Sequence, residues 1–248
     1  MSISINYRGR LCNNIIQYLV GQYLSNKFDM KFDSDINLEP SFNVIKTSGS
    51  KTFLNQKIVD DSNILDYLNL ETLSSNLLLN GFFQKKEIFL NKHFLNFCKN
   101  SIIPKKIENK PDLFVHVRLG DVEQHSMNLP FEYYKNQIDK ISYNTMTIST
   151  DNPSSNIIKN LQQLYKNTHI FECTNPIEAV HYGACSNKLI IGSGSFGFCM
   201  ALFAESTTDI YCIDHNSISS YFNSTIWDGD MIEAFKDRPK THFYTQNL

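Results

Sequence analysis

The chain has 248 residues, of which 42% are hydrophobic, 12% aromatic and 19% charged, and its formal net charge at pH 7 is −2. So much apolar material in a chain of this length excludes general disorder and predicts a core that buries most of the unfolded surface. The small net charge argues against a non-specific nucleic-acid binder, because such a protein needs a basic face.

The N-terminal region predicts an irregular alternation of strands and helices. Residues 3–7 read as a strand, and residues 38–60 give no clear pattern. Apolar spacing predicts helices over three segments, 15–24, 63–70 and 87–98. Asn13 and Asn14 stand directly before the first of these helices, where an asparagine side chain commonly caps the backbone N–H groups. A polar stretch with two prolines, 104–111, then predicts a linker.

The C-terminal region alternates regularly between strands and helices. Strands are expected at 113–117, 146–149, 169–171, 188–191 and 210–213, and helices at 133–141, 157–164, 176–185 and 196–205. Such alternation implies right-handed crossovers and a parallel sheet that is covered on both faces. We therefore predict two α/β halves with a cleft between them, residues 1–105 and residues 111–248.

No apolar run approaches the ~20 residues that a membrane-spanning helix needs, and the first residues do not resemble a signal peptide. The six cysteines have neither CxxC nor zinc-finger spacing. We interpret them as reduced, mostly buried thiols and expect a cytoplasmic protein. One or two disulfides in a secretory compartment is the alternative.

An arginine follows the strand expected at 113–117. Ligands of doubly wound sheets bind beyond the carboxyl ends of the strands. The guanidinium of Arg118 would point there, and its planar fork matches phosphate oxygens in a bidentate way. Asp121 could orient it. The alternative is an ordinary Arg–Asp ion pair at the end of a strand.

A small-residue loop joins the strand at 188–191 to the next helix. It consists of Gly192, Ser193, Gly194, Ser195 and Phe196. Glycines permit a close approach of the backbone, the free N–H groups of a helix start attract anions, and serine hydroxyls add donors. The loop therefore suits a phosphate group. A tight strand-to-helix turn with a serine N-cap is the alternative.

Several other polar residues carry weaker signals. His116 lies within the strand at 113–117 and is either a pocket residue or a core histidine with a satisfied hydrogen bond. Glu123 and His125 follow that strand in a loop and are candidate general bases, unless the loop is merely exposed surface. Two Asp-x-Asp strings, at 33–35 and 228–230, are of the kind that holds a divalent ion against a diphosphate. Their places in the chain favour solvated turns instead.

Segments between residues 8 and 205 resemble, in order and spacing, the α-1,2-fucosyltransferases and the wider superfamily of α-1,2, α-1,6 and protein O-fucosyltransferases. Residues 116–121 resemble the His-x-Arg-Arg-x-Asp motif, and 190–196 resemble the Asn-Ser-Ser-Phe loop. Further matching segments are 8–18, 80–84, 129–134 and 147–151. The chain departs from the family pattern at Leu119, at Cys12-Asn13-Asn14 and at Phe198-Cys199, which leaves the donor and the linkage open.

The resemblance implies a GT-B-like fold of two Rossmann-type halves: 1–105 on the acceptor side and 111–248 binding the nucleotide sugar. It implies a metal-independent, inverting transfer of L-fucose from GDP-fucose to a glycan hydroxyl, α-1,2-like, without a cofactor. The resemblance also implies roles for single residues. Arg118 would bind the donor diphosphate, Ser195 and Phe196 would line the phosphate loop, and His116 would shape the same pocket. Asn13 would lie on the N-terminal side of the cleft, and Glu178 would lie near the nucleotide base or ribose.

The chemistry of glycosyl transfer agrees with these positions. Negative charge grows on the departing diphosphate, and Arg118 with the loop at 192–195 supplies donors aimed at it. Glu123 is our first choice as the base, before His125 or Asp121. Three alternatives remain: another GDP- or UDP-sugar as donor, a catalytically silent nucleotide- or sugar-binding protein, and an unrelated α/β binding module in which both loops are structural.

Overall fold

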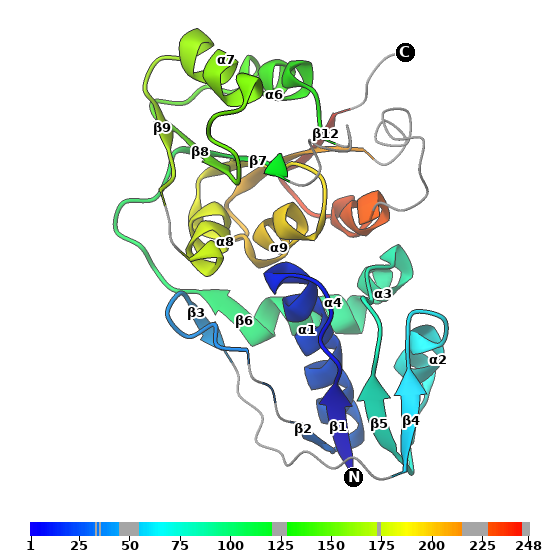
Figure 1. Cartoon of the computed structure of the whole chain (residues 1–248). Coiled ribbons are helices and arrows are strands. Elements are labelled where there is room, and N and C mark those ends of the chain that lie inside the picture. The colour runs from blue at the N-terminus through cyan, green and yellow to red at the C-terminus, as the bar shows by residue number, and fades with distance from the viewer. Residues whose placement is uncertain are drawn as a thin grey trace. The chain divides into compact units, whose positions relative to one another are not determined.

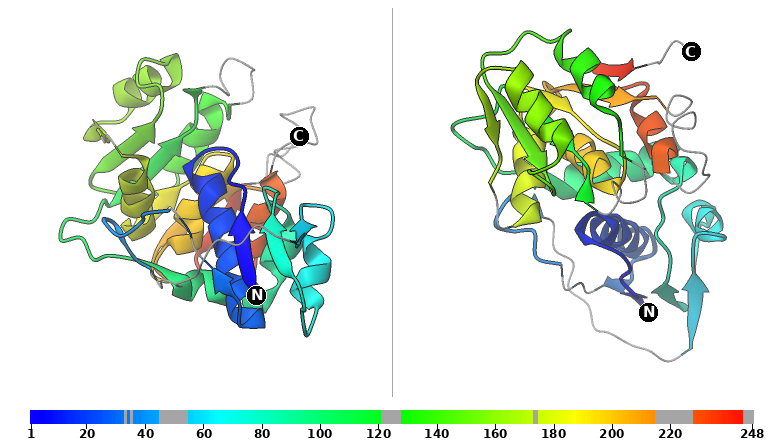
Figure 2. Two further views of the ribbon diagram at one scale, coloured as in Figure 1. Left: turned by 60° about the horizontal axis from the view of Figure 1, so that its bottom comes forward. Right: turned by 45° about the horizontal axis from the view of Figure 1, so that its top comes forward.

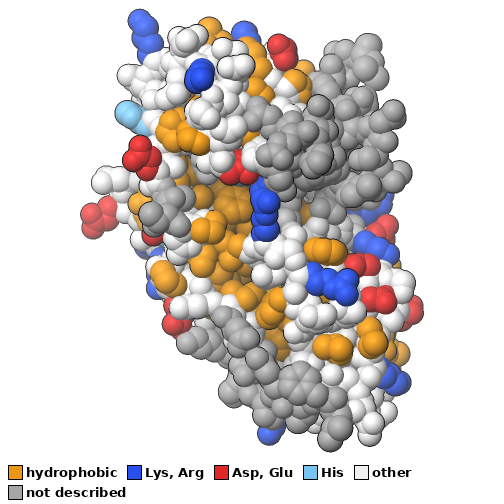
Figure 3. All heavy atoms as spheres, viewed as in Figure 1, with side chains coloured by type: hydrophobic (Ala, Val, Ile, Leu, Met, Phe, Trp, Pro, Cys, Tyr) orange, Lys and Arg blue, Asp and Glu red, His pale blue; other side chains and the backbone are white. Residues whose placement is uncertain are grey.

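The computed structural model describes residues 1–32, 34, 36–44, 55–120, 128–172, 175–214 and 228–244, of which 228–230 are described by their backbone alone (Figure 1). The chain forms two compact units, Met1–Ile103 and Pro104–Leu248. Basic and acidic side chains are interspersed on the face drawn in Figure 3, in keeping with the small net charge.

Unit 1 is built on a parallel sheet. Its described strands are β1 (Ser2–Ile5), β2 (Lys31–Phe32), β4 (Gln56–Val59) and β5 (Asn76–Leu79), in the order β2-β1-β5-β4. A separate pair joins β3 (Phe42–Val44) to β6 (Ile102–Pro104). Helix α1 (Leu11–Phe28) packs against β1 and β2, and Figure 2 shows it, in blue, beside β1. A Cβ at Gly21 would collide with the ring of Phe32, so glycine permits this close packing.

Two helix predictions in unit 1 are wrong in detail. The helix α1 begins at Leu11 after Arg10, so Asn13 and Asn14 lie in its first turn and do not cap it. The single helix expected over 87–98 is two helices, α3 (Lys86–Leu90) and α4 (Lys92–Ser101). Asn91 separates them because its backbone is extended and its side chain accepts the N–H of Phe94, which caps α4. The short helix expected at 63–70 is present as α2 (Ile64–Asn69).

Unit 2 contains a parallel sheet whose described strands are β7 (Leu113–Val117), β8 (Met146–Thr150), β9 (Thr168–Ile170), β10 (Lys188–Ile190), β11 (Asp209–Ile213) and β12 (Thr241–Tyr244). Their order is β12-β11-β10-β7-β8-β9. If β7 is counted as the first strand, this is the strand order of a doubly wound dinucleotide-binding sheet. In such a sheet the direction of winding reverses between the first and the fourth strand. Here these strands are β7 and β10, so the topological switch point lies between them.

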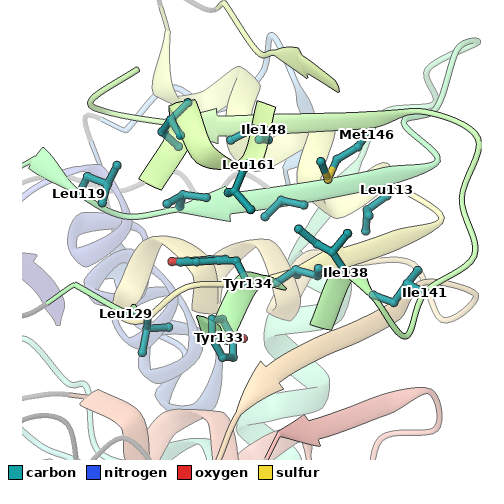
Figure 4. Close-up of a cluster of buried hydrophobic side chains, with 14 of the residues drawn as sticks. Leu113, Leu119, Leu129, Tyr133, Tyr134, Ile138, Ile141, Met146, Ile148 and Leu161 are labelled. Carbon is teal, nitrogen blue, oxygen red and sulfur yellow. The ribbon is translucent and has the colours of Figure 1, made fainter. Parts of the chain in front are cut away.

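Helices cover both faces of the unit 2 sheet, as predicted. Figure 1 shows α6 (Phe131–Ile138) and α7 (Asn156–Leu164) over one face, and α8 (Pro176–Cys185) and α9 (Ser195–Phe203) over the other. A 3-10 helix, η1 (Asp228–Phe235), packs on α9. The core between β7, β8, α6 and α7 appears in Figure 4, where Tyr134, Ile138 and Leu161 meet apolar side chains of both strands. Every residue of β7 is buried, as is typical of a strand covered on both faces, whereas β8 alternates apolar with hydroxyl side chains.

The described cysteines, at positions 12, 98, 185, 199 and 212, are buried thiols, as expected for them. Cys173 lies outside the described residues. Within the described part of the chain, no helix combines the length and the apolar character that crossing a lipid bilayer requires.

Candidate active site at the switch point of unit 2

The carboxyl ends of β7 and β10 bring the two predicted phosphate-binding sequences together. These strands pair in parallel, with Val115 opposite Ile190. A Cβ placed on Gly192 would lie 3.1 Å from the carbonyl oxygen of His116 and 3.5 Å from the backbone nitrogen of Arg118. The glycine-serine loop after β10 therefore lies directly against the segment that carries Arg118. Ligands of doubly wound folds bind at this position.

Arg118 forms an ion pair with Asp151, a carboxylate that is not among the predicted site residues. Its Nη1 lies 3.6 Å from Oδ2 of Asp151, and 19% of its side chain is exposed. Asp151 follows β8, the neighbour of β7 on the side away from β10. We had expected Asp121 to orient Arg118, but Asp121 lies outside the described residues. Asp151 lies in the turn just after the strand predicted at 146–149, but only the strand order shows that this strand end is next to that of β7.

The glycine-serine loop leads into α9 through a backbone conformation that favours glycine. Gly194 has φ 93° and is the N-cap residue of α9, and Ser195 is the first residue of the helix. The serine N-cap of the alternative interpretation is therefore wrong. A Cβ at Gly197 would lie 2.9 Å from the carbonyl oxygen of Gly192. The first turn of α9 therefore lies against the loop. With glycine as N-cap, no side chain of that residue covers the first N–H groups of the helix.

His116 is buried, and its imidazole is neutral at pH 7. Only 4% of the residue is exposed, and its ring centre lies 4.9 Å from that of Phe196. Burial lowers the pKa of His116 to about 4; the nearby Asp151 carboxylate opposes this and the Arg118 guanidinium adds to it. The backbone of Ser149 also favours the charged imidazole, but neither ring nitrogen makes a hydrogen bond of ordinary geometry with described residues. That His116 is a pocket residue stays a prediction.

One buried hydroxyl at this edge, Oγ of Ser193, lacks a hydrogen-bond partner among the described residues. The buried Oη of Tyr134 interacts with the backbone of Arg118. Tyr134 Oη lies 3.1 Å from the position of a Gly192 Cβ, whereas the neighbouring Tyr133 donates its hydroxyl to the carbonyl of Ile191 (2.9 Å). Other such atoms are distributed over α1, α6, β12 and Ser75. A buried polar group without a partner costs about 1–3 kcal/mol, so the Ser193 hydroxyl at this strand edge favours a polar ligand there.

Asn13 lies at the carboxyl edge of the unit 1 sheet. Its Oδ1 accepts a hydrogen bond from Nε2 of Gln84 (2.8 Å), and its Nδ2 occupies the place that a Cβ of Gly9 would need. Asn6, after β1, donates to Oδ1 of Asn80, after β5 (2.9 Å). The segments 8–18 and 80–84, both part of the family resemblance, are thus joined at this edge.

The remaining predicted site residues are placed as follows. Glu178 is exposed in the first turn of α8. Asp121, Glu123 and His125 lie outside the described residues, as do Asp33 and Asp35 and the side chains of Asp228 and Asp230. Over the ranges that the structure describes, no three His, Cys, Asp or Glu side chains form a group that could hold a metal ion.

No protein-family model matches the chain, and no curated protein matches it. Solved structures do. A structure of NodZ α-1,6-fucosyltransferase soaked with GDP-fucose has a TM-score of 0.51 and 11% identity over 82% of this chain and 92% of that chain. A structure of the fucosyltransferase NodZ from Bradyrhizobium has a TM-score of 0.54 and 10% identity over 82% and 93%. The fold is GT-B-like. At this identity the likeness shows the fold, and it confirms the predicted fold class.

Proposed function

We propose that this protein is a glycosyltransferase that transfers L-fucose from GDP-fucose to a hydroxyl of a glycan acceptor. The observation that carries the proposal is the meeting of Arg118 with the loop from Gly192 to Ser195 at the switch point between β7 and β10. The similar NodZ structure was soaked with GDP-fucose, which supports this donor. In the proposal, residues 111–248 bind the donor and residues 1–105, with Asn13, serve the acceptor.

The proposed catalysis is electrostatic. When the bond between the sugar and the diphosphate breaks, negative charge grows on the diphosphate oxygens. The guanidinium of Arg118, the hydroxyls of Ser193 and Ser195 and the N–H groups at the start of α9 would stabilise that charge. These groups take the part that a metal ion plays in other transferases, so the proposal is metal-independent and needs no cofactor. Glu178 is proposed to contact the nucleotide base or ribose.

The proposed transfer inverts the configuration of the sugar. The acceptor hydroxyl attacks the anomeric carbon from the face opposite the diphosphate and gives its proton to a base. Glu123 is the proposed base, with His125 and Asp121 as alternatives. His116 is not suited to this role because it is buried against Phe196; it would instead offer a neutral hydrogen-bonding surface to the donor. An α-1,2-like linkage follows from the resemblance of the motifs.

The side chain of Leu119 favours a second candidate. It is fully buried in the core cluster of unit 2, at the position where the family motif has a second arginine. The site therefore has one guanidinium fewer than the motif supplies. A different GDP- or UDP-sugar, or nucleotide binding without transfer, would suit a site with less positive charge.

Donor turnover tests the proposal. Release of GDP from GDP-fucose, measured with and without a mixture of glycan acceptors, should be detectable for the unaltered protein. Arg118→Ala should lower it by about 10²-fold or more, because one charge-stabilising donor is lost, while the thermal unfolding temperature stays the same. Lys236→Ala, which removes an exposed cation of the same unit, is the control and should have no effect.

Near-normal turnover by Arg118→Ala would remove the mechanism. Turnover of a UDP-sugar alone would favour the different donor. Nucleotide binding with no turnover of any donor would favour the silent binding protein.

A further inference from the structure

Asp151 makes three contacts with the segment that follows β7. Its Oδ1 accepts the N–H of Leu119 at 2.9 Å, and its Oδ2 lies 3.6 Å from Nη1 of Arg118. A Cβ on Gly120 would collide with the same carboxylate. The register of the sheet explains this meeting, since Val117 pairs with Thr150 and the next residue of each strand therefore lies beside the other.

We propose that Asp151 is a positioning residue that aims the guanidinium of Arg118 at the donor diphosphate before the donor arrives. One carboxylate oxygen fixes the backbone just after Arg118, and the other draws the guanidinium to one side. The inference rests on the proposed function, because it concerns the same diphosphate site. It assigns to Asp151 the role of determining where the guanidinium of Arg118 points.

The two effects of Asp151 on an anionic ligand oppose each other. Ordering a long arginine side chain in advance removes part of the entropy loss from binding, so Asp151 strengthens binding through Arg118. The carboxylate is itself an anion with 37% of its side chain exposed, and it repels a diphosphate directly. With Arg118 present the first effect dominates. Without Arg118 only the repulsion remains.

This opposition distinguishes positioning from a merely structural role. A structural residue would weaken binding by the same factor whether or not Arg118 is present. A positioning residue that acts through Arg118 no longer strengthens binding when Arg118 is removed, and its remaining effect is absent or opposite in sign. The suitable variant is Asp151→Asn, whose amide oxygen still accepts the Leu119 N–H while the negative charge is lost.

The experiment measures GDP binding by calorimetry for the unaltered chain, Asp151→Asn, Arg118→Ala and the double variant. We expect Asp151→Asn to weaken GDP binding about fivefold when Arg118 is present, a size usual for contacting charged residues. In the Arg118→Ala background the same change should strengthen binding or leave it unchanged. Asp139→Asn removes an exposed, ion-paired carboxylate on the same unit and should change GDP binding in neither background.

An equal weakening by Asp151→Asn in both backgrounds would overturn the inference and leave the proposed function standing. So would no effect of Asp151→Asn when Arg118 is present. If the unaltered protein binds neither GDP nor GDP-fucose, the proposed function is wrong and the inference falls with it. If Asp151→Asn does not fold, Asp151→Glu replaces it, because glutamate keeps the charge but places it elsewhere. Asp151→Glu must then weaken GDP binding when Arg118 is present and not when Arg118 is absent.

Discussion

The buried imidazole of His116 links the stability of unit 2 to pH. Its pKa is about 4 in the folded protein and 6.5 in the ordinary exposed state, with burial as the largest cause. The unfolded chain therefore binds a proton at a pH where the folded chain does not. The stabilisation is fully present above about pH 6.5 and is lost as the pH falls through about 4. At about 1.4 kcal/mol for each pKa unit, the difference amounts to roughly 3 kcal/mol.

The perturbation that isolates this effect is His116→Gln, because glutamine does not titrate. We expect the free energy of unfolding of the unaltered protein to fall by roughly 3 kcal/mol more than that of His116→Gln between pH 6.5 and 4. Urea titrations at a series of pH values provide the measurement, with hydrogen exchange in a peptide that covers β7 reporting on unit 2 itself. Carboxylates titrate in both proteins, so their effect cancels in the comparison.

His169→Gln serves as the matched control, because His169 is an exposed histidine of the same unit. It controls for the loss of an imidazole on the surface of the same unit. Equal pH slopes for the unaltered protein and His116→Gln would show that the imidazole is not held neutral by burial, and would refute the reasoning.

The other predictions concern packing and helix ends, and thermal or urea unfolding measures each. Tyr134→Phe should lower the free energy of unfolding by about 1 kcal/mol, because the buried hydroxyl interacts with the backbone of Arg118; unchanged stability would contradict this. Gly192→Ala should lower the free energy of unfolding by ~1 kcal/mol. The loss should be smaller in the Tyr134→Phe background, because the Tyr134 hydroxyl is one of the atoms 3.1 Å from the new methyl group. Arg238→Met should cost about 2 kcal/mol, because the guanidinium donates to three carbonyls at the end of α9; a neutral result would show that water replaces it. Asn91→Ala should cost ~1 kcal/mol through the lost cap of α4, whereas an unchanged midpoint would contradict the capping role.

The sequence predicted strands β7 to β11 of unit 2 and the helices between them from their apolar residues and periodicity, but it predicted neither η1 nor β12. That same regularity placed Arg118 and the loop at Gly192 on the carboxyl edge of a parallel sheet. Their adjacency needed the strand order, which no local pattern contains. Asp151 was missed for this reason, since its partner comes from a neighbouring strand that is distant in sequence.

The errors in unit 1 have local causes. Apolar residues continue at helical spacing on both sides of Asn91, so periodicity alone does not reveal the break between α3 and α4. Asn13 was assigned to capping, but its side chain is used in a tertiary contact with Gln84.

The most direct test of the central claim is a crystal of this protein soaked with GDP and, separately, with UDP. The account predicts density for GDP with its diphosphate between the guanidinium of Arg118 and the loop from Gly192 to Ser195, at the start of α9. Nucleotide density elsewhere in the molecule, or no density from a soak at saturating GDP, would contradict it.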